Sequence, residues 1–383
     1  MNDGLSTHKV EVFRIDTIEK HPQADRLGLV YPFGRGGYSC VVNADDFKVG
    51  DLACYIPPDS IAPDAPEFSF LGEHKRIKVR RYRGVLSQGL LMPAPPGAQI
   101  GDDVAKQMGI THYAPPDEEG GDNIKAPRRV AKRRYPKTFM GWLRFLFYAG
   151  VRAMGFYTHE PELTEEIPMQ IPIFDVDSFY RYPSLFQAGE EVVATEKING
   201  QNARFVFVPE PGMDGKFSSG RMYCGSHRQW KAAGPNNWWD ALRQHPEVES
   251  FCRSNPLTVV FAEIFGPRAQ GKYPYGVSPR KIGLAVFDLW ENGRFLSYEE
   301  AHALDRESPE ALRLPWAPEV YIGGFDPQRL LDLGNDLTSP TAACFGRQER
   351  AEGIVIKPLV ERWDRTIGRV CLKIVSKLYL SKD

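Results

Sequence analysis

A lysine ends a predicted strand near the middle of the chain and is followed by a turn. The strand covers residues 191–195 and leads into Glu196-Lys197-Ile198-Asn199-Gly200. A neutral lysine amine can attack phosphorus, but only about one free lysine in 2,500 is neutral at pH 7. The chemistry therefore needs partial desolvation or a neighbouring cation to lower the pKa of Lys197. Taken alone, the motif also fits an exposed loop lysine beside a turn glycine.

Two acids and another lysine follow, each at a strand end or in an apolar strand. Glu263 ends an apolar strand, where a carboxylate can accept hydrogen bonds from a ribose hydroxyl. Glu352 precedes a β-branched strand, and a hard oxygen ligand beside phosphates suits Mg²⁺. Lys373 lies in the otherwise apolar segment Leu372-Lys373-Ile374-Val375, where a charge needs a partner such as a phosphate. Taken alone, Glu263 also fits a surface position at a strand end, and Glu352 also fits a turn before a strand.

Six segments in this order resemble the motifs of the covalent nucleotidyltransferases, a superfamily of ATP-dependent ligases and mRNA-capping guanylyltransferases. The segments are Glu196-Lys197-Ile198-Asn199-Gly200, Gly225-Ser226-His227-Arg228, Phe261-Ala262-Glu263-Ile264-Phe265-Gly266, Val286-Phe287-Asp288-Leu289, Glu352-Gly353-Ile354-Val355-Ile356-Lys357 and Leu372-Lys373-Ile374-Val375. The resemblance covers roughly the C-terminal 220 residues, and the order of the segments makes it specific.

The resemblance implies a role for each matching residue. It makes Lys197 the nucleophile and places Lys373 at the α-phosphate of ATP. Glu352 is the implied ligand of Mg²⁺, for which Mn²⁺ can substitute. The implied contacts to ATP or AMP are Glu196, Ile198, Gly200, Asn202, Arg228, Glu263, Phe287, Lys357, Lys373 and Lys377. The second motif departs from the family's Ser-Arg, so either His227 or Arg228 takes the phosphate contact. Phe287 stacks on adenine in this scheme, although an aromatic residue in an apolar strand is more often core.

Two features favour the RNA-ligase branch of the superfamily. The pattern from Glu196 to Asn202 matches E-K-x-x-G-x-N, and Asn199 stands where DNA ligases and capping enzymes usually carry Asp. The predicted barrel precedes the catalytic motifs, and only ten residues follow Lys373. This layout resembles nick-sealing ATP-dependent RNA ligases with an N-terminal OB-like domain, which act in RNA repair through lysyl-AMP. A capping-type guanylyltransferase, a DNA ligase and an RNA-binding protein with an inactive ligase core remain as alternatives.

The pattern along the chain predicts an α+β protein of two domains. Residues 1–112 are expected to form the OB-like β-barrel, residues 113–165 a linker with a basic run and an inserted helix, and residues 166–383 the adenylyltransferase domain. The expected strands are residues 10–15, 77–80, 191–195, 203–208, 258–261, 284–287 and 370–375. The expected helices are residues 237–252 and 299–306.

A cluster of cations in the first domain predicts a nucleic-acid contact, although a charge run is as often a solvated surface. The residues are Lys75, Arg76, Lys78, Arg80, Arg81 and Arg83. The formal net charge of the chain is only −1, so RNA or an RNA-containing nicked duplex must be bound by such local patches.

The composition indicates where in the cell the protein is expected. The six cysteines show no C-x-x-C spacing, which argues against a zinc site or a disulfide framework and favours a reducing, cytoplasmic location. The polar N-terminus predicts no secretory signal, and the most apolar stretch, residues 139–157, carries two arginines, so no membrane association is expected. A monomer is expected.

Overall fold

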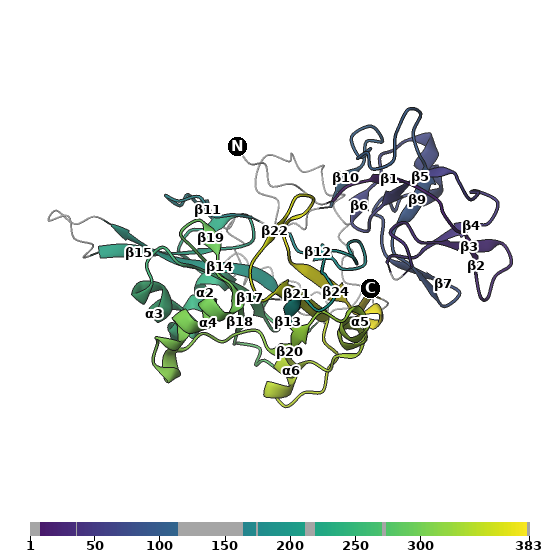
Figure 1. Cartoon of the computed structure of the whole chain (residues 1–383). Coiled ribbons are helices and arrows are strands. Elements are labelled where there is room, and N and C mark those ends of the chain that lie inside the picture. Colours follow the sequence, from purple (N-terminus) through teal and green to yellow (C-terminus); the bar gives the residue numbers. More distant parts are fainter. Residues whose placement is uncertain are drawn as a thin grey trace, which may run out of the picture.

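The structure is a computed structural model, and it describes residues 8–35, 37–113, 164–173, 175–210, 219–269 and 273–380. A small β-domain and a larger α+β domain lie side by side (Figure 1). The basic run and the inserted helix predicted within residues 113–165 fall almost wholly outside the described residues.

The first domain is built from short strands separated by turns. Its strands are β1 (Glu11–Arg14), β2 (Glu19–Lys20), β3 (Leu27–Val30), β4 (Cys40–Asn43), β5 (Leu52–Ile56), β6 (Ser60–Ile61), β7 (Arg80–Tyr82), β8 (Val85–Ser87), β9 (Leu90–Pro93) and β10 (Thr111–His112), with a 3₁₀ turn over Pro66–Leu71. They pair in the orders β1-β5-β9, β2-β3-β4, β7-β8 and β6-β10. Alternating residues such as Val12 and Cys54 fill the core. The predicted strand over residues 77–80 is wrong in its bounds, because the pairing begins at Arg80.

The second domain contains two large sheets. The seven-stranded sheet has the order β11-β16-β15-β14-β17-β18-β19, and the five-stranded sheet has the order β12-β24-β21-β13-β20. The first comprises β11 (Thr164–Glu165), β14 (Gln201–Glu210), β15 (Ser219–Gly225), β16 (Trp230–Lys231), β17 (Val259–Phe265), β18 (Gly283–Glu291) and β19 (Arg294–Phe295). The second comprises β12 (Asp177–Ser178), β13 (Glu191–Lys197), β20 (Glu319–Gly324), β21 (Gly353–Pro358) and β24 (Leu372–Val375), and a hairpin of β22 (Trp363–Asp364) and β23 (Gly368–Arg369) joins β21 to β24.

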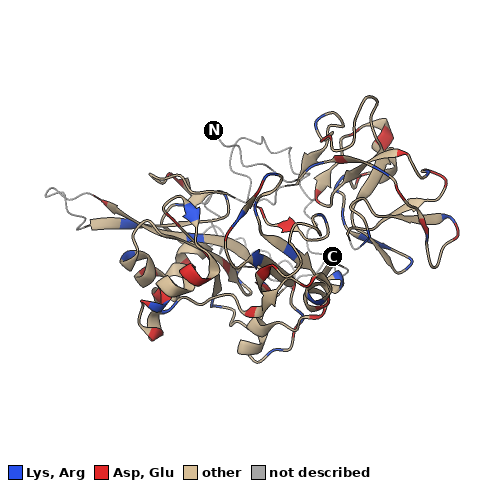
Figure 2. Ribbon diagram, viewed as in Figure 1, with Lys and Arg blue, Asp and Glu red and all other residues tan. Residues whose placement is uncertain are grey.

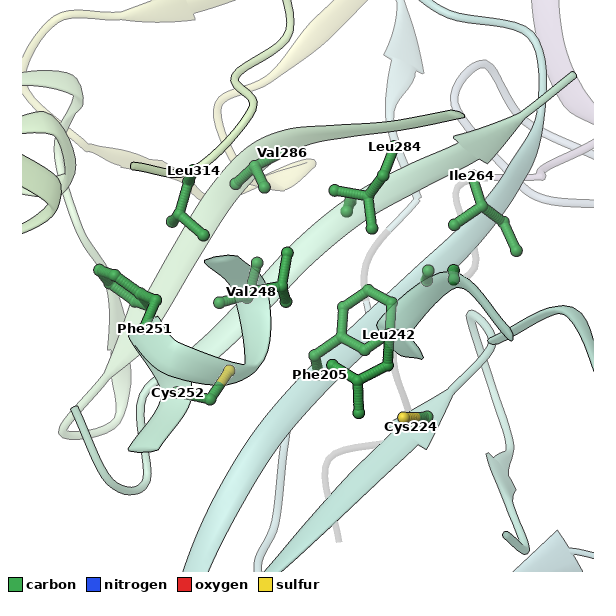
Figure 3. Packing of buried hydrophobic residues seen from close by; sticks show 14 of the residues in the cluster. Phe205, Cys224, Leu242, Val248, Phe251, Cys252, Ile264, Leu284, Val286 and Leu314 are labelled. Carbon is green, nitrogen blue, oxygen red and sulfur yellow. The ribbon is translucent and has the colours of Figure 1, made fainter. Parts of the chain in front are cut away.

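Helices cover the outer faces of both sheets. The helices are α2 (Asn237–Gln244), α3 (Pro246–Ser254), α4 (Tyr298–Arg306), α5 (Pro327–Asp336), α6 (Pro340–Cys344) and α7 (Lys377–Leu380), with a 3₁₀ turn over Glu310–Leu312. Phe251 of α3 and Leu242 of α2 pack on Phe205 and Val286 of the seven-stranded sheet (Figure 3). The single helix predicted over residues 237–252 is two helices, because Pro246 has no N–H to continue the first and starts the second.

Candidate active site

The predicted nucleophile lies at the end of a strand inside the five-stranded sheet. Lys197 is the last residue of β13, and it pairs in register with Gly353 of β21. Glu352 directly precedes Gly353, and its Oε1 lies 2.6 Å from Lys197 Nζ. A Cβ at Gly353 would lie 1.9 Å from the carbonyl oxygen of Ile374, so only glycine fits between these strands. The Glu-Gly motif thus places a carboxylate directly on the lysine.

Lys373 lies on the next strand of the same sheet. It belongs to β24, which pairs with β21, and it lies opposite Val355. Burial and then the positive charge of Lys197 lower the pKa of Lys373. Burial would also lower the pKa of Lys197, but the carboxylates of Glu352 and Glu263 raise it above its ordinary value. The expectation of a lowered pKa at Lys197 is therefore wrong for the protein without ligands, in which the amine is protonated.

The second acid reaches the site from the other sheet. Glu263 lies on β17 and accepts a hydrogen bond from the backbone of Gly200, the glycine of the lysine motif. Burial, opposed by Lys197 and reinforced by Glu352, raises the pKa of Glu263 to about 8. A Cβ at Gly200 would lie 2.2 Å from the carbonyl oxygen of Ile264, so the close approach of β17 itself requires this glycine. The two sheets therefore meet at the lysine.

A pocket of about 130 Å³ opens between the sheets beside Lys197. Its lining includes Ile198, Asn202, Glu263, Phe287 and Lys357, all predicted to contact a nucleotide. Asn202 Oδ1 is buried and has no hydrogen-bond partner among the described residues. A buried acceptor without a partner costs free energy, and a ligand donor would satisfy it. The pocket matches a flat base held between apolar walls.

The amine of Lys357 is engaged at the base of this pocket. Its Nζ donates to Asp288 Oδ1 at 2.7 Å and to the carbonyl oxygen of Phe287 at 2.8 Å. Asp288 also pairs with Arg369, whose second partner is Glu361. The positive charges of Arg369 and Lys357 outweigh burial and lower the pKa of Asp288. Lys357 thus holds the strand that carries Phe287 in place. The sequence predicted a nucleotide contact for Lys357 but not this structural role.

Glu196 precedes the nucleophile but points to a helix. Its buried carboxylate accepts hydrogen bonds from the Ser339 hydroxyl and from the backbone N–H and hydroxyl of Thr341. These donors belong to the N-terminal end of α6. The Glu196 carboxylate thus links β13, the strand of Lys197, to the N-terminal end of α6.

The turn between β15 and β16 carries the divergent second motif. His227 Nε2 lies 3.3 Å from Asp175 Oδ1, and Asp175 also interacts with Lys373 and Arg228. Arg228 is exposed and lines a separate groove with Gln229 and Trp230. His227 is therefore the member of the motif that faces the lysine side of the site.

Sequence reasoning missed the residue that holds this turn. The buried Arg204 donates from Nε to the carbonyl oxygen of Ser226 at 2.7 Å and stacks on Trp230 with 4.5 Å between the guanidinium carbon and the ring centroid. An arginine in the apolar strand of residues 203–208 is the sequence signal that could have revealed it.

A larger cleft of about 590 Å³ lies between the two domains and reaches the same lysine. The second domain contributes Asp175, Asp177, Arg181, Lys197, Glu352, Lys373 and Tyr379 to its walls, and the first contributes His8, Asp59, Arg76, Lys78, Gln88 and His112. Because Lys197 lines both cavities, a ligand in the pocket would present one end to the cleft.

The predicted basic cluster divides at this cleft. Arg76 and Lys78 line it, and Arg76 is held by Asp59 and stacks 3.6 Å over the centroid of the Tyr113 ring. Lys75 pairs instead with Asp64, and Arg80, Arg81 and Arg83 lie on the exposed β7–β8 hairpin. Charges of both signs are spread over the two domains (Figure 2).

The C-terminal helix closes over the loop after the nucleophile. Asn199 donates from its amide side chain to the Tyr379 hydroxyl at 2.5 Å, and its backbone N–H donates to the Tyr275 hydroxyl at 2.7 Å. Tyr273 stacks on Tyr379 with ring centroids 5.0 Å apart. Lys377 is exposed at the start of the same helix and lines neither cavity. The sequence could not show that tyrosines rather than Lys377 face the site.

The acidic groups fit a cation only together with a phosphorylated ligand. Among the described residues, no group of three or more His, Cys, Asp or Glu side chains could hold a metal ion. Glu352 Oε2 is buried without a hydrogen-bond partner in the described part of the chain, and Glu263 interacts electrostatically with Glu352. Mg²⁺ is commonly held by one or two carboxylates plus substrate phosphates, which matches this donor set.

The arrangement defines a class: a β-rich domain before a two-sheet nucleotidyltransferase domain with a motif lysine. Residues 190–375 match the RNA ligase family, and residues 9–94 match an OB-fold domain family. The C-terminal domain therefore belongs to the RNA ligase family and follows an N-terminal OB fold, as the motifs predicted. No curated protein matches the chain.

Solved structures share the architecture over the whole chain. A mutant RNA ligase of Naegleria gruberi, solved with ATP and Mn, is 19% identical, with a TM-score of 0.70 over 98% of each chain. Another mutant of that ligase, solved without ligand, is 20% identical at the same TM-score and coverage. A third, solved with AMP and Mn, is 19% identical with a TM-score of 0.70 over 98% of this chain and 99% of that one.

Within the described ranges, no helix is long and apolar enough to cross a bilayer.

Proposed function

We propose that the protein is an ATP-dependent RNA ligase that joins a 3′-hydroxyl end to a 5′-phosphate end. One observation carries the proposal: Lys197, Glu352, Glu263 and Lys373 converge beside the base-sized pocket and the interdomain cleft, both of which Lys197 lines. The pocket takes the adenosine, Glu263 accepts from the ribose, and Phe287 stacks on the base. The phosphates then lie toward Lys197 and Lys373.

The proposed reaction has three steps. Lys197 Nζ attacks the α-phosphorus of ATP and forms a P–N bond. The P–O bond between the α-phosphorus and the departing pyrophosphate breaks. The 5′-phosphate of the RNA then attacks the lysyl-AMP phosphorus and releases the lysine. The 3′-hydroxyl finally attacks the activated 5′-phosphorus, which forms the phosphodiester and frees AMP. Lys373 neutralises charge at the α-phosphate, and the walls orient the reacting atoms.

The proposal also covers the divalent cation. Glu352 would hold Mg²⁺ or Mn²⁺ together with the phosphates, and the bound cation would neutralise phosphate charge and lower the pKa of Lys197. Glu352 would then no longer be available to hold the lysine as an ammonium. The RNA ligase with ATP and Mn named above supports this choice of ligands.

We further propose a nicked, RNA-containing duplex as the substrate and nick repair as the role. The OB-fold domain, which covers residues 1–112 in this scheme, would bind the duplex beside the adenylyltransferase domain of residues 166–383. The pairing of β11 with β16 of the catalytic sheet supports a start of that domain at Thr164, two residues earlier. We propose that the enzyme is a monomer and that it is cytoplasmic. Its six free cysteines support the cytoplasmic location, because thiols persist in a reducing compartment.

The test is covalent labelling with α-labelled ATP. The wild-type protein should retain the label through denaturing electrophoresis in the presence of Mg²⁺, and Lys197→Ala should abolish it. Lys106→Ala changes an exposed lysine of the first domain and should label normally. Label that survives Lys197→Ala, or label from GTP in place of ATP, would refute the assignment.

Strand joining needs its own test. A nick with a ribose 3′-hydroxyl and a 5′-phosphate should be sealed, and a nick with a deoxyribose at the 3′ end should be sealed less well. Equal sealing of an all-DNA nick would favour a DNA ligase. Tight RNA binding by a protein that neither labels nor seals would indicate an inactive core.

A further inference from the structure

The hairpin of β22 and β23 (residues 359–369) displays a tryptophan that the proposed chemistry does not use. Trp363 is 68% exposed, an unusual position for so large an aromatic side chain. The hairpin joins β21, which directly follows Glu352, to β24, which contains Lys373. It projects from the second domain (Figure 1).

Local hydrogen bonds and packing define the conformation of the hairpin. Asp364 Oδ1 accepts from the backbone N–H of Thr366 at 2.7 Å and of Ile367 at 3.4 Å, which closes the turn. A Cβ at Gly368 would lie 3.4 Å from Trp363 Cζ3, so the indole packs beside the opposite arm. The tryptophan is thus fixed by local contacts while most of its surface stays open to solvent.

Buried ion pairs fasten the base of the hairpin to the catalytic core. Arg369 lies opposite Trp363 in register and donates to Asp288 Oδ1 and Oδ2 at 2.8 and 2.7 Å. Asp288 directly follows Phe287, which lines the nucleotide pocket. Ile367 packs on the cluster that includes Tyr180, a residue of the interdomain cleft. The tryptophan is therefore held at a set position relative to both cavities.

We propose that Trp363 is a stacking platform for a nucleobase of the RNA that the enzyme joins, an inference that rests on the proposed ligase function. A fixed, open indole matches a base, because every base offers a flat face and stacking does not depend on sequence. Arg365 is exposed at the tip of the hairpin, and no described residue forms an ion pair with it. A cation beside an aromatic ring is the combination by which proteins bind polynucleotides. Of the charged side chains that flank the indole in sequence, Arg362 pairs with Glu190 and Asp364 is bonded within the turn. Arg365 therefore remains as the exposed charge, which favours a polynucleotide over an apolar protein partner.

The test separates adenylylation from the steps that use RNA. Wild-type enzyme and the variants Trp363→Ala, Trp363→Leu and Trp363→Phe are charged with labelled ATP and then mixed with a nicked duplex carrying a 5′-phosphate. Charging should be equal in all four proteins. Trp363→Ala and Trp363→Leu should bind the nick roughly tenfold or more weakly and seal it more slowly at limiting duplex, and Trp363→Phe should retain most of the binding. Val360→Ala changes another exposed side chain of the hairpin and should behave as the wild type.

Each outcome decides one claim. Wild-type binding and sealing by Trp363→Ala would overturn the platform, and so would full activity of Trp363→Leu, which keeps apolar bulk without a π face. Failure of the wild-type protein to charge or to seal would instead overturn the ligase function. Arg365→Ala should also lower the slope of log affinity against log salt by about one, and an unchanged slope would remove Arg365 from the contact.

Discussion

The proposed nucleophile, Lys197, is held as an ammonium in the protein without ligands. Glu352 lies 2.6 Å from its Nζ, and the two carboxylates of the site outweigh the effect of burial and raise the pKa of Lys197. The amine is therefore unreactive until something else takes up the negative charge of Glu352. Binding of ATP with a divalent cation would do so, which couples activation of the nucleophile to the presence of its target.

The first prediction concerns this ion pair. In Glu352→Gln, burial acts on Lys197 without its strongest opposing charge, so its pKa falls. The rate of lysine adenylylation should then begin to rise at a lower pH than in the wild type, while its maximum falls because the proposed cation ligand is lost. Single-turnover labelling from about pH 6 to about pH 10 measures both effects, with subsaturating ATP reporting the pKa of the free enzyme and saturating ATP the maximum. An unshifted profile would show that Glu352 does not set the pKa.

A second prediction concerns Glu263, whose pKa is raised to about 8, chiefly by burial. The folded protein then binds a proton that the unfolded chain releases above about pH 4.5, so stability falls as pH rises from about 4.5 to about 8. Glu263→Gln removes this dependence and should stabilise the ligand-free protein by about 1–3 kcal/mol near pH 8.5, and much less near pH 5. Thermal unfolding at the two pH values measures the difference. Glu307→Gln, at an exposed position, should change neither melting temperature, and equal shifts for Glu263→Gln at both would contradict the assignment.

Among the elements, a buried ion network links the two sheets. Asp288 of β18 pairs with Lys357 of β21 at 2.7 Å and with Arg369 of β23, and all three side chains are less than a tenth exposed. Two cations face two acids once Glu361 is included, so the network is neutral as a whole. The network sets the separation of the sheets at the pocket where Phe287 lies.

The third prediction follows from that balance. Asp288→Asn leaves two buried cations with one acid, and removing one partner of a buried pair typically costs about 3–5 kcal/mol. Denaturant unfolding should show a loss of this order, together with a raised KM for ATP in adenylylation. Asp336→Asn, which breaks the exposed pair with Arg350, should cost less than about 1 kcal/mol. Equal costs for the two variants would show that the network does not stabilise the domain.

Strand pattern and motif order predicted most of the catalytic domain but not what each side chain contacts. Runs of apolar and β-branched residues located β13, β14, β17, β18 and β24, because buried strands carry that signal in their own residues. α5 and α6 escaped prediction, since short helices gain their stability from tertiary contacts such as the hydrogen bonds from Ser339 and Thr341 to Glu196.

The site shows the same division between local and distant information. Lys197, Glu263, Glu352 and Lys373 could be found from motifs, and the structure brings all four together. The roles of Lys357 and Glu196 could not be found, because their partners lie 69 and 145 residues away in the sequence. The sequence also did not predict which residues of the first domain line the cleft, apart from Arg76 and Lys78 of the basic run.

At the scale of the whole molecule, the two domains are fastened by specific contacts. Arg181 donates to Glu11 Oε2 at 3.2 Å, and Tyr38 and Tyr180 lie with ring centroids 5.9 Å apart. Tyr180 and Arg181 closely follow β12, which pairs with the strand of Lys373. The first domain is therefore held against the part of the second domain that carries Lys373, and its cleft residues are placed with the site.

A fourth prediction tests this coupling. Arg181→Ala removes the ion pair between the domains and leaves a cavity in the interface, so the domains should unfold as two resolved transitions in calorimetry where the wild type shows one. Adenylylation should also slow, because the cleft wall is less fixed. Arg35→Ala breaks an exposed pair with Glu19 within the first domain and should leave the scan unchanged. A single, unshifted transition in Arg181→Ala would mean that the interface adds little.

The distribution of thiols gives the native sequence a built-in attachment point for spectroscopy. Cys344 is exposed, whereas Cys40, Cys54, Cys224, Cys252 and Cys371 are buried, and burial raises the pKa of each of these five thiols. A maleimide dye should therefore react at one position without any engineered substitution. That position ends α6, the helix whose first turn is bonded to the residue before the nucleophile. Fluorescence from this dye should therefore report in real time on any change in the surroundings of α6 during charging with nucleotide.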